Sequence, residues 1–220
     1  MRRKLIATED GSKTLYVPGL DEHYHSRFGA ITESRHIFIE AAFEYSGKDP
    51  VRVLEFGMGT GLNVLLSYEQ SIKETRTVYY HAVEKYPVTA YEINNLSFTD
   101  HIKEADAKIF QQIHESEWGC ETCIGESFTL LKTQLDFREF ETSDRFDVIY
   151  FDAFSPEVQP ELWTERMFQK IASFSNPGTV LTTYSSKGLV KRHLIAAGFS
   201  IEKLPGPPGK REFLRAIKNS

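Results

Sequence analysis

The residues best suited to chemistry are three acids that each follow a short apolar run. They are Glu84 after residues 78–83, Asp136 after residues 128–135 and Asp152 after residues 148–151. Such runs are typical of strands buried on both faces of a parallel sheet, and open α/β sheets bind ligands beyond the carboxyl ends of their strands. We therefore expect the three carboxylates to line one rim of a sheet. Asp152 is the strongest catalytic candidate, because Pro156 and Pro160 end any regular element directly after it.

A glycine-rich turn precedes these acids in the chain. Gly57, Gly59 and Gly61 follow an apolar run at residues 51–56 and open a helical pattern. Bare backbone amides at a helix start suit an anionic or nucleotide ligand, although a tight turn without a ligand is the alternative. The spacing lacks the third glycine of a dinucleotide fingerprint, which removes the best support for hydride transfer. Glu84 follows at nearly the interval at which an acid binds ribose hydroxyls in nucleotide-binding units.

The remaining elements predict one α/β domain over residues 1–220, with residues 1–49 as an N-terminal extension. A helix is expected from near Thr32, capped by Thr32 or Ser34. Further helices are predicted in residues 98–118, 163–174 and 189–197, the second ended by Asn-Pro-Gly at residues 176–178. Strands are predicted at residues 179–184, 199–204 and 212–217, and a hairpin around Gly125.

Composition predicts a cytoplasmic protein without a membrane span. No run approaches the about 20 apolar residues that a spanning helix needs, and the start Met-Arg-Arg-Lys is not followed by an apolar segment. Cys120 and Cys123 form a C-x-x-C pair without the further ligands that a zinc site requires. We therefore expect no metal, and two small residues on a strand are the simpler interpretation.

Charge is distributed unevenly along the chain, whose formal net charge is -5. Residues 100–161 are strongly acidic, whereas residues 185–220 carry eight Lys and Arg against two Glu. A basic segment of this kind can hold a polyanion, or it can be a solvated edge. The candidates for phosphate contacts are Lys187, Lys191, Arg192, Lys210 and Arg211.

Four separated motifs resemble a known family. They are Leu-Glu-Phe-Gly-Met-Gly-Thr-Gly-Leu-Asn at residues 54–63, Glu-Lys-Tyr-Pro at 84–87, Asp-Ala-Phe-Ser-Pro at 152–156 with Pro-Glu-Leu-Trp at 160–163, and Gly-x-x-Gly-Lys-Arg-Glu at 206–212. The order of elements is similar to that of class I S-adenosylmethionine (SAM)-dependent methyltransferases. The motifs themselves resemble the methyltransferase half of the MnmC family of tRNA wobble-uridine modification enzymes, in its stand-alone, MnmD-type form.

The resemblance implies a doubly wound, Rossmann-like fold with a mostly parallel seven-stranded sheet and an antiparallel last strand. It implies SAM-dependent methylation of the aminomethyl group of 5-aminomethyl-2-thiouridine in the anticodon region of tRNA, without an FAD-dependent oxidase activity. By position, Asp152 would face the substrate amine. The cofactor would lie among Glu33, Glu55, Gly57, Gly59, Gly61, Glu84 and Asp136, so the N-terminal extension, residues 1–49, would contribute to the cofactor site.

The same acids allow other functions. Phe154 and Tyr184 could stack a flipped base, while core packing is the better interpretation for Trp163. An aminopropyltransferase, or another small-amine methyltransferase, would use strand-end acids without needing the basic segment. A non-catalytic RNA-binding module would need neither the glycine loop nor a cofactor.

Overall fold

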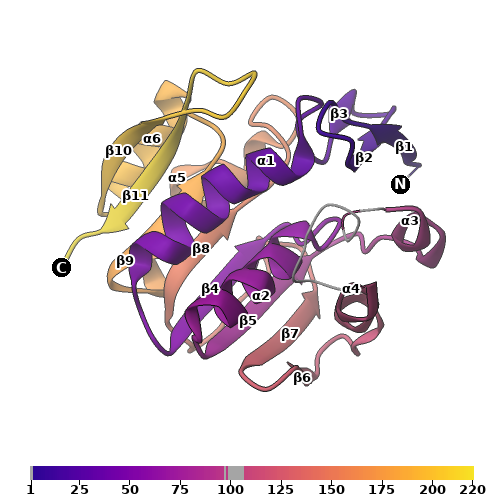
Figure 1. Ribbon diagram of the computed structural model, residues 1–220. Helices are drawn as coiled ribbons and strands as arrows, with labels where there is room; N and C mark the ends of the chain where they lie inside the picture. Colours follow the sequence, from indigo (N-terminus) through magenta and orange to yellow (C-terminus); the bar gives the residue numbers. More distant parts are fainter. Residues whose placement is uncertain (1, 97, 99–106) are drawn as a thin grey trace.

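The computed structural model of the protein describes residues 2–96, 98 and 107–220. One sheet of eight strands forms its centre (Figure 1). In spatial order the strands are β10 (Phe199–Pro205), β11 (Glu212–Lys218), β9 (Ser175–Thr183), β8 (Phe146–Phe151), β4 (Val51–Phe56), β5 (Val78–Glu84), β7 (Phe128–Gln134) and β6 (Glu121–Ile124). The five strands from β9 to β7 are parallel, whereas β11 runs antiparallel to both of its neighbours.

The predicted α/β fold is confirmed, with one strand more than expected. The additional strand is β6, the first arm of the predicted hairpin, which pairs antiparallel with β7 at the edge of the sheet. It contains Cys123, and both cysteines are free and exposed. None of the described helices is long and apolar enough to cross a membrane.

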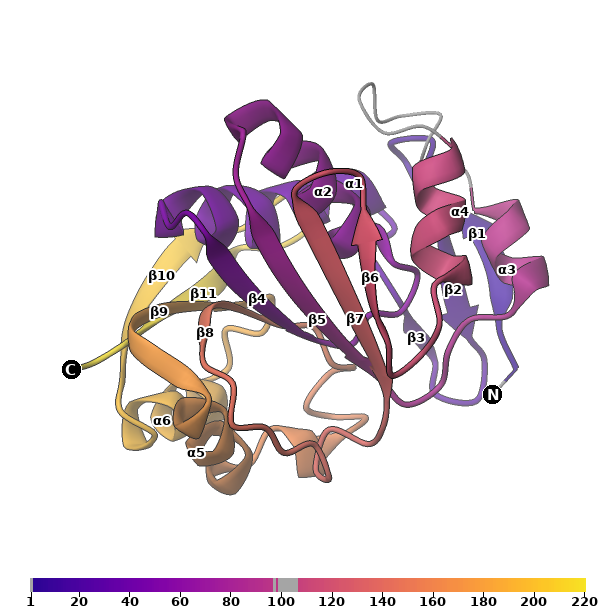
Figure 2. The ribbon, with the colours of Figure 1, turned by 90° about the horizontal axis from the view of Figure 1, so that it is seen from below.

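Helices cover both faces of the sheet (Figure 2). Helix α1 (Ala30–Ser34), its continuation η1 (Arg35–Glu44) and α2 (Leu62–Glu74) lie on one face, and α5 (Glu165–Ser173) and α6 (Gly188–Ala196) lie on the other. Alternate residues of β4 therefore enter two different cores. Val53 packs in the first core, while Leu54 and Phe56 pack in the second.

Three further helices lie near the edge of the sheet where the parallel strands have their carboxyl ends. Helix α3 (Ala90–Asn95) follows β5, η3 (Pro160–Leu162) follows β8, and α4 (Ala107–Glu115) confirms one helix of the predicted 98–118 segment. Part of that segment, residues 99–106, lies outside the described residues. Trp163 is 1% exposed and meets Phe151 edge-on, so its predicted role in the core is confirmed.

Two local predictions were wrong. The first helix begins at Ala30, near the predicted start, but its N-cap is Gly29 and not Thr32 or Ser34, and Gly29 makes no side-chain hydrogen bond. Asp10 from a neighbouring loop takes the place of a capping side chain, because its Oδ2 lies 3.4 Å from both the amide nitrogen and the hydroxyl of Thr32. Residues 176–178 do not separate helix from strand but belong to β9, where the register with β8 shifts between Phe146 and Val148.

The N-terminal extension forms a small antiparallel sheet of β1 (Lys4–Ala7), β2 (Lys13–Val17) and β3 (Glu22–His23). Arg3 ties it to the segment after β5. Its side chain is 3% exposed and donates to the hydroxyl of Tyr24, to the carbonyl oxygens of Tyr86 and Pro87, and to Glu92. The buried guanidinium thus fixes the extension against the rim of the sheet.

Replacement of Arg3 by alanine is expected to destabilise the protein by about 3 kcal/mol, because it leaves the carboxylate of Glu92 without its buried partner. Arg2 is the matched control, since it is the exposed neighbour in the same segment. Urea unfolding of Arg3→Ala and Arg2→Ala measures the difference. Equal urea midpoints for the two variants would contradict the proposed role of Arg3 in anchoring the N-terminal extension.

Candidate active site

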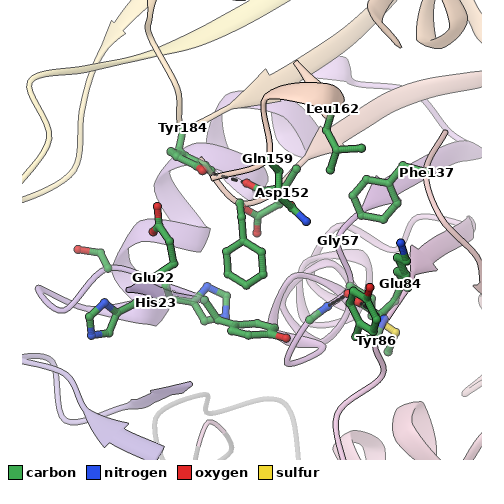
Figure 3. Close-up of a pocket in the computed structure, with 18 of the residues that line it drawn as sticks. Glu22, His23, Gly57, Glu84, Tyr86, Phe137, Asp152, Gln159, Leu162 and Tyr184 are labelled. Carbon is green, nitrogen blue, oxygen red and sulfur yellow. Dashed lines mark hydrogen bonds between the residues drawn. The ribbon is translucent and has the colours of Figure 1, made fainter. Parts of the chain in front are cut away.

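A cavity of about 400 Å³ opens at the carboxyl ends of β4, β5, β7 and β8. The structure brings many of the predicted residues together in its wall: Glu33, Gly57, Gly59, Glu84, Asp136, Asp152, Phe154, Tyr184 and Lys210. Figure 3 shows Asp152 in the middle, with Glu22, His23 and Tyr184 to one side and Glu84, Tyr86 and Phe137 to the other. The cavity therefore has two halves that meet at Asp152.

Strand pairing places Asp152 beside the glycine loop. The amide of Asp152 donates to the carbonyl oxygen of Phe56 at 2.9 Å, so β8 ends next to the end of β4. A Cβ atom at Gly57 would lie 2.3 Å from the carbonyl oxygen of Asp152, and Gly57 has φ +99°. Only glycine allows the two segments to approach this closely.

Glu84 holds the other side of the loop. Its carboxylate accepts hydrogen bonds from the amides of Gly59 at 3.0 Å and of Tyr86 at 2.7 Å. Each carboxylate oxygen has a second lone pair available, so Glu84 can still accept a hydrogen bond from a ligand hydroxyl. This geometry suits the ribose contact that was predicted from its spacing.

Asp152 is held by a buried hydrogen-bond network that sequence reasoning missed. The side-chain amide of Asn63 donates to Asp152 Oδ2 at 3.2 Å and to Glu55 Oε1 at 2.9 Å, and Tyr80 donates its hydroxyl to Glu55 Oε2. Burial, with a smaller contribution from the negative charge of Glu33, raises the pKa of Asp152 to about 7. Burial likewise raises the pKa of Glu55 to about 8.

Asp136 has the opposite electrostatics. Hydrogen bonds from the Arg138 guanidinium, and then from the Lys85 ammonium, hold its pKa well below the usual range. Asp136 therefore stays charged under all ordinary conditions, whereas Asp152 changes its charge near neutral pH. Of the two acids, Asp152 is the one suited to accept and release a proton.

Some predicted residues lie outside the cavity wall. Glu55, predicted to lie around the cofactor, is fully buried and does not line the cavity; it is linked to Asp152 through the side-chain amide of Asn63. Gly61 is the N-cap of α2 and also does not line the cavity. The other residues outside the wall are Lys187, Lys191, Arg192 and Arg211.

These four basic residues gather at the same edge of the sheet as the cavity. Lys187 is the N-cap of α6, directly beyond β9, and Lys191 and Arg192 lie within α6. Arg211 lies in the turn after β10, which runs parallel to β9. Lys187 pairs with Glu157, and Lys191 lies 3.8 Å from a carboxylate oxygen of Glu212.

The N-terminal extension supplies wall residues that were not predicted. Residues 22–27 line the cavity, among them Glu22, His23 and Tyr24, and Gln159 joins them from the segment after β8. The ring of Tyr24 meets Phe154 edge-on at 5.2 Å between centroids. No periodicity in the sequence indicated that this segment folds over the sheet.

A family model described as an S-adenosyl-L-methionine-dependent methyltransferase matches residues 82–219. The chain belongs to this methyltransferase family. Its predicted SAM cofactor and its enzymatic character are thereby confirmed. The match begins within β5 and includes the acids Glu84, Asp136 and Asp152.

Curated relatives and a solved structure are similar to the methyltransferase over most of its length. The "tRNA 5-methylaminomethyl-2-thiouridine biosynthesis bifunctional protein MnmC" of Methylobacillus flagellatus is 29% identical over 87% of the chain, and that of Ectopseudomonas mendocina is 30% identical over 87%. The chain spans about a third of the length of these relatives. The structure of MnmC2 from Aquifex aeolicus has a TM-score of 0.81 at 25% identity, covering 98% of this chain and 70% of that one.

A spermidine synthase structure from Thermotoga maritima shares only the fold, with a TM-score of 0.56 at 12% identity over 98% of this chain and 72% of that one. It therefore gives no support to the aminopropyltransferase alternative.

The residues of the cavity fit SAM. Its carboxylates suit a positively charged sulfonium, and the wall at Gly57 and Gly59 leaves no room for side chains. A Cβ atom at Gly59 would lie 2.9 Å from the Tyr24 ring. When bound, SAM supplies the methyl group that the reaction transfers.

We expect the affinity for SAM to rise between pH 6 and pH 8. Below a pKa of about 7 Asp152 is protonated and neutral, and above it the carboxylate is charged and attracts the sulfonium. If the bound cation lowers this pKa by about one unit, the gain in affinity approaches about tenfold. Calorimetric titrations across this range measure it, with Asp152→Asn as the control whose curve should be flatter. A wild-type affinity that does not change with pH would contradict the expectation.

Proposed function

We propose that this methyltransferase acts on the primary amine of 5-aminomethyl-2-thiouridine at the wobble position of tRNA and forms 5-methylaminomethyl-2-thiouridine. The printed names of the relatives supply the substrate class. The single observation that carries the chemistry is the carboxylate of Asp152, which lines the cavity between its two halves. The proposal covers the methyl transfer and requires no FAD.

Asp152 orients the amine and accepts its proton in this proposal. A primary amine is a nucleophile only when neutral, and a carboxylate with a pKa near 7 can take a proton and release it again at neutral pH. The hydrogen bond from Asn63 restricts the carboxylate to one orientation. Positioning contributes a large share of catalysis when the reacting groups are a good nucleophile and a good electrophile.

The two halves of the cavity then have different occupants. We assign Gly57, Gly59, Glu84 and Asp136 to the cofactor, with Glu84 as the acceptor for ribose hydroxyls. Tyr184 lies in the other half (Figure 3), and both Tyr184 and Phe154, which also lines the cavity, offer aromatic surface to a wobble base that is flipped out of its stack. The four basic residues outside the wall, near the same rim, would contact phosphates of the anticodon region.

The proposal treats the chain as one methyltransferase domain. Residues 1–49 contribute to its site through Glu33 and the wall segment 22–27. A tRNA substrate places the activity in the cytoplasm.

Competing substrates test this function. The protein is incubated in parallel with SAM and tRNA carrying wobble 5-aminomethyl-2-thiouridine, and with decarboxylated SAM and putrescine. We expect methylated tRNA and no aminopropylated product. Aminopropyl transfer without methylation of the tRNA would support the alternative enzyme and refute the proposal.

A further inference from the structure

The ammonium group of Lys210 lies inside the cavity, where it contacts an acid and an aromatic ring. Its Nζ lies 2.5 Å from Oε1 of Glu33 and 4.1 Å from the centroid of the Tyr184 ring. Glu33 is 7% exposed, and its other oxygen accepts a hydrogen bond from the amide of Ser26. The Lys210 side chain keeps 28% of its surface exposed, so it reaches inward from the mouth of the cavity.

The backbone that carries Lys210 is held firmly against the N-terminal part of the chain. The turn between β10 and β11 is closed by hydrogen bonds from Gly206 to Arg211 and from Lys210 to Pro207. Gly209 packs so tightly against the ring of Phe28 that a Cβ atom there would lie 2.1 Å from it. If the ammonium group of Lys210 exchanges its partners, the flexible four-carbon side chain must therefore move while the backbone stays in place.

Lys210 is itself a primary alkylammonium, the chemical group that the proposed substrate presents. A carboxylate and an aromatic face are the usual partners of such a cation. Asp152 is close enough for the positive charge of Lys210 to favour its ionised form. Glu33 and Tyr184 thus contact a cation of the same class as the substrate amine, within the electrostatic reach of Asp152.

We propose that in the absence of RNA the ammonium group of Lys210 occupies the subsite for the substrate amine, beside Glu33 and Tyr184. It leaves this subsite when it binds a phosphate of the bound RNA. This inference rests on the proposed function. It makes Lys210 a specificity-determining residue. A free amine must displace the lysine ammonium from the subsite by itself, whereas an RNA substrate also supplies a phosphate to which that ammonium can bind. The neighbouring Arg211 adds a second positive charge where that phosphate would lie.

The size of the effect follows from the fraction of molecules with an open subsite. If Lys210 fills the subsite nine-tenths of the time, a free amine binds about tenfold more weakly than its intrinsic affinity. Removing the ammonium should restore that affinity. The same change should weaken RNA binding, since one phosphate contact is lost.

Binding of a free amine tests the subsite without requiring turnover. The nucleoside 5-aminomethyluridine is titrated into wild-type protein, Lys210→Ala and Lys210→Met, each saturated with S-adenosylhomocysteine, whose binding also verifies that the site is folded. Both variants should bind the nucleoside about tenfold more tightly than wild type. The control is Lys203→Ala on the same hairpin, where the ammonium pairs with Glu212, and it should match wild type. Affinities in the Lys210 variants that are equal to or weaker than that of wild type would overturn the inference.

Activity on two substrates separates this role from a structural one. For Lys210→Met we expect kcat/KM to rise on the nucleoside and to fall on tRNA, with the slope of log affinity for tRNA against log salt concentration reduced by about one. A parallel fall on both substrates would show that Lys210 merely supports the site and would overturn the proposal. If wild-type protein fails to methylate tRNA while nucleoside binding still differs between the variants, the proposed function fails and the occupied subsite stands.

Discussion

Replacement of Asp152 by asparagine is expected to lower kcat for methyl transfer by about 10²- to 10⁴-fold, the usual contribution of a positioned general base. Asparagine has nearly the same shape, and its carbonyl oxygen can still accept the hydrogen bond from Asn63. It cannot take a proton from the amine. The loss should therefore fall on kcat, with a much smaller change in the KM for tRNA.

Rapid quench under single-turnover conditions measures this step directly. Glu157→Gln is the matched control, because Glu157 is an exposed acid in the same segment after β8 and lies outside the cavity wall. It should retain wild-type turnover. An Asp152→Asn variant with more than a tenth of wild-type kcat would exclude Asp152 as the base.

Replacement of Gly57 by alanine is expected to destabilise the protein by about 3 kcal/mol or more and to abolish SAM binding. The added Cβ would lie 2.3 Å from the carbonyl oxygen of Asp152, so the ends of β4 and β8 must separate. The φ of +99° adds strain for any residue with a side chain. Both effects act where the half of the cavity that we assign to the cofactor meets Asp152, the proposed base.

The variant Gly119→Ala is the control that separates the cost of backbone strain from the cost of the steric clash at Gly57. Gly119 also has a positive φ, of +82°, but a Cβ there would meet nothing within 4 Å, so about 1 kcal/mol of backbone strain is expected alone. Urea unfolding of the two variants and calorimetry with SAM measure the contrast. Equal destabilisation of both would mean that close packing at Gly57 has no special cost.

The rim acids were predictable because topology determines their position. In a parallel sheet every strand ends at the same edge, so Glu84, Asp136 and Asp152 had to meet once their strands were identified. The glycine loop lies beside them for the same reason, since β4 pairs with both β5 and β8.

Other features depend on contacts between distant parts of the chain, which local patterns do not encode. Glu55 precedes the glycine loop in sequence, yet the buried network around Asn63 and Tyr80 turns it away from the cavity. Lys210 was predicted to contact phosphate, but Glu33, 177 residues earlier in the chain, holds its ammonium in the cavity. The small N-terminal sheet escaped prediction because its strands are short and carry no clear alternation.

The position of the transferred methyl tests the central claim most directly. Wobble-modified tRNA is incubated with the protein and SAM carrying an isotopically labelled methyl group, digested with a sequence-specific ribonuclease, and analysed by fragmentation mass spectrometry. We predict one labelled methyl on the aminomethyl nitrogen of the wobble uridine, formed at least about a hundredfold more slowly by Asp152→Asn. A label on any other nucleotide or atom, or no label in the tRNA at all, would contradict the account.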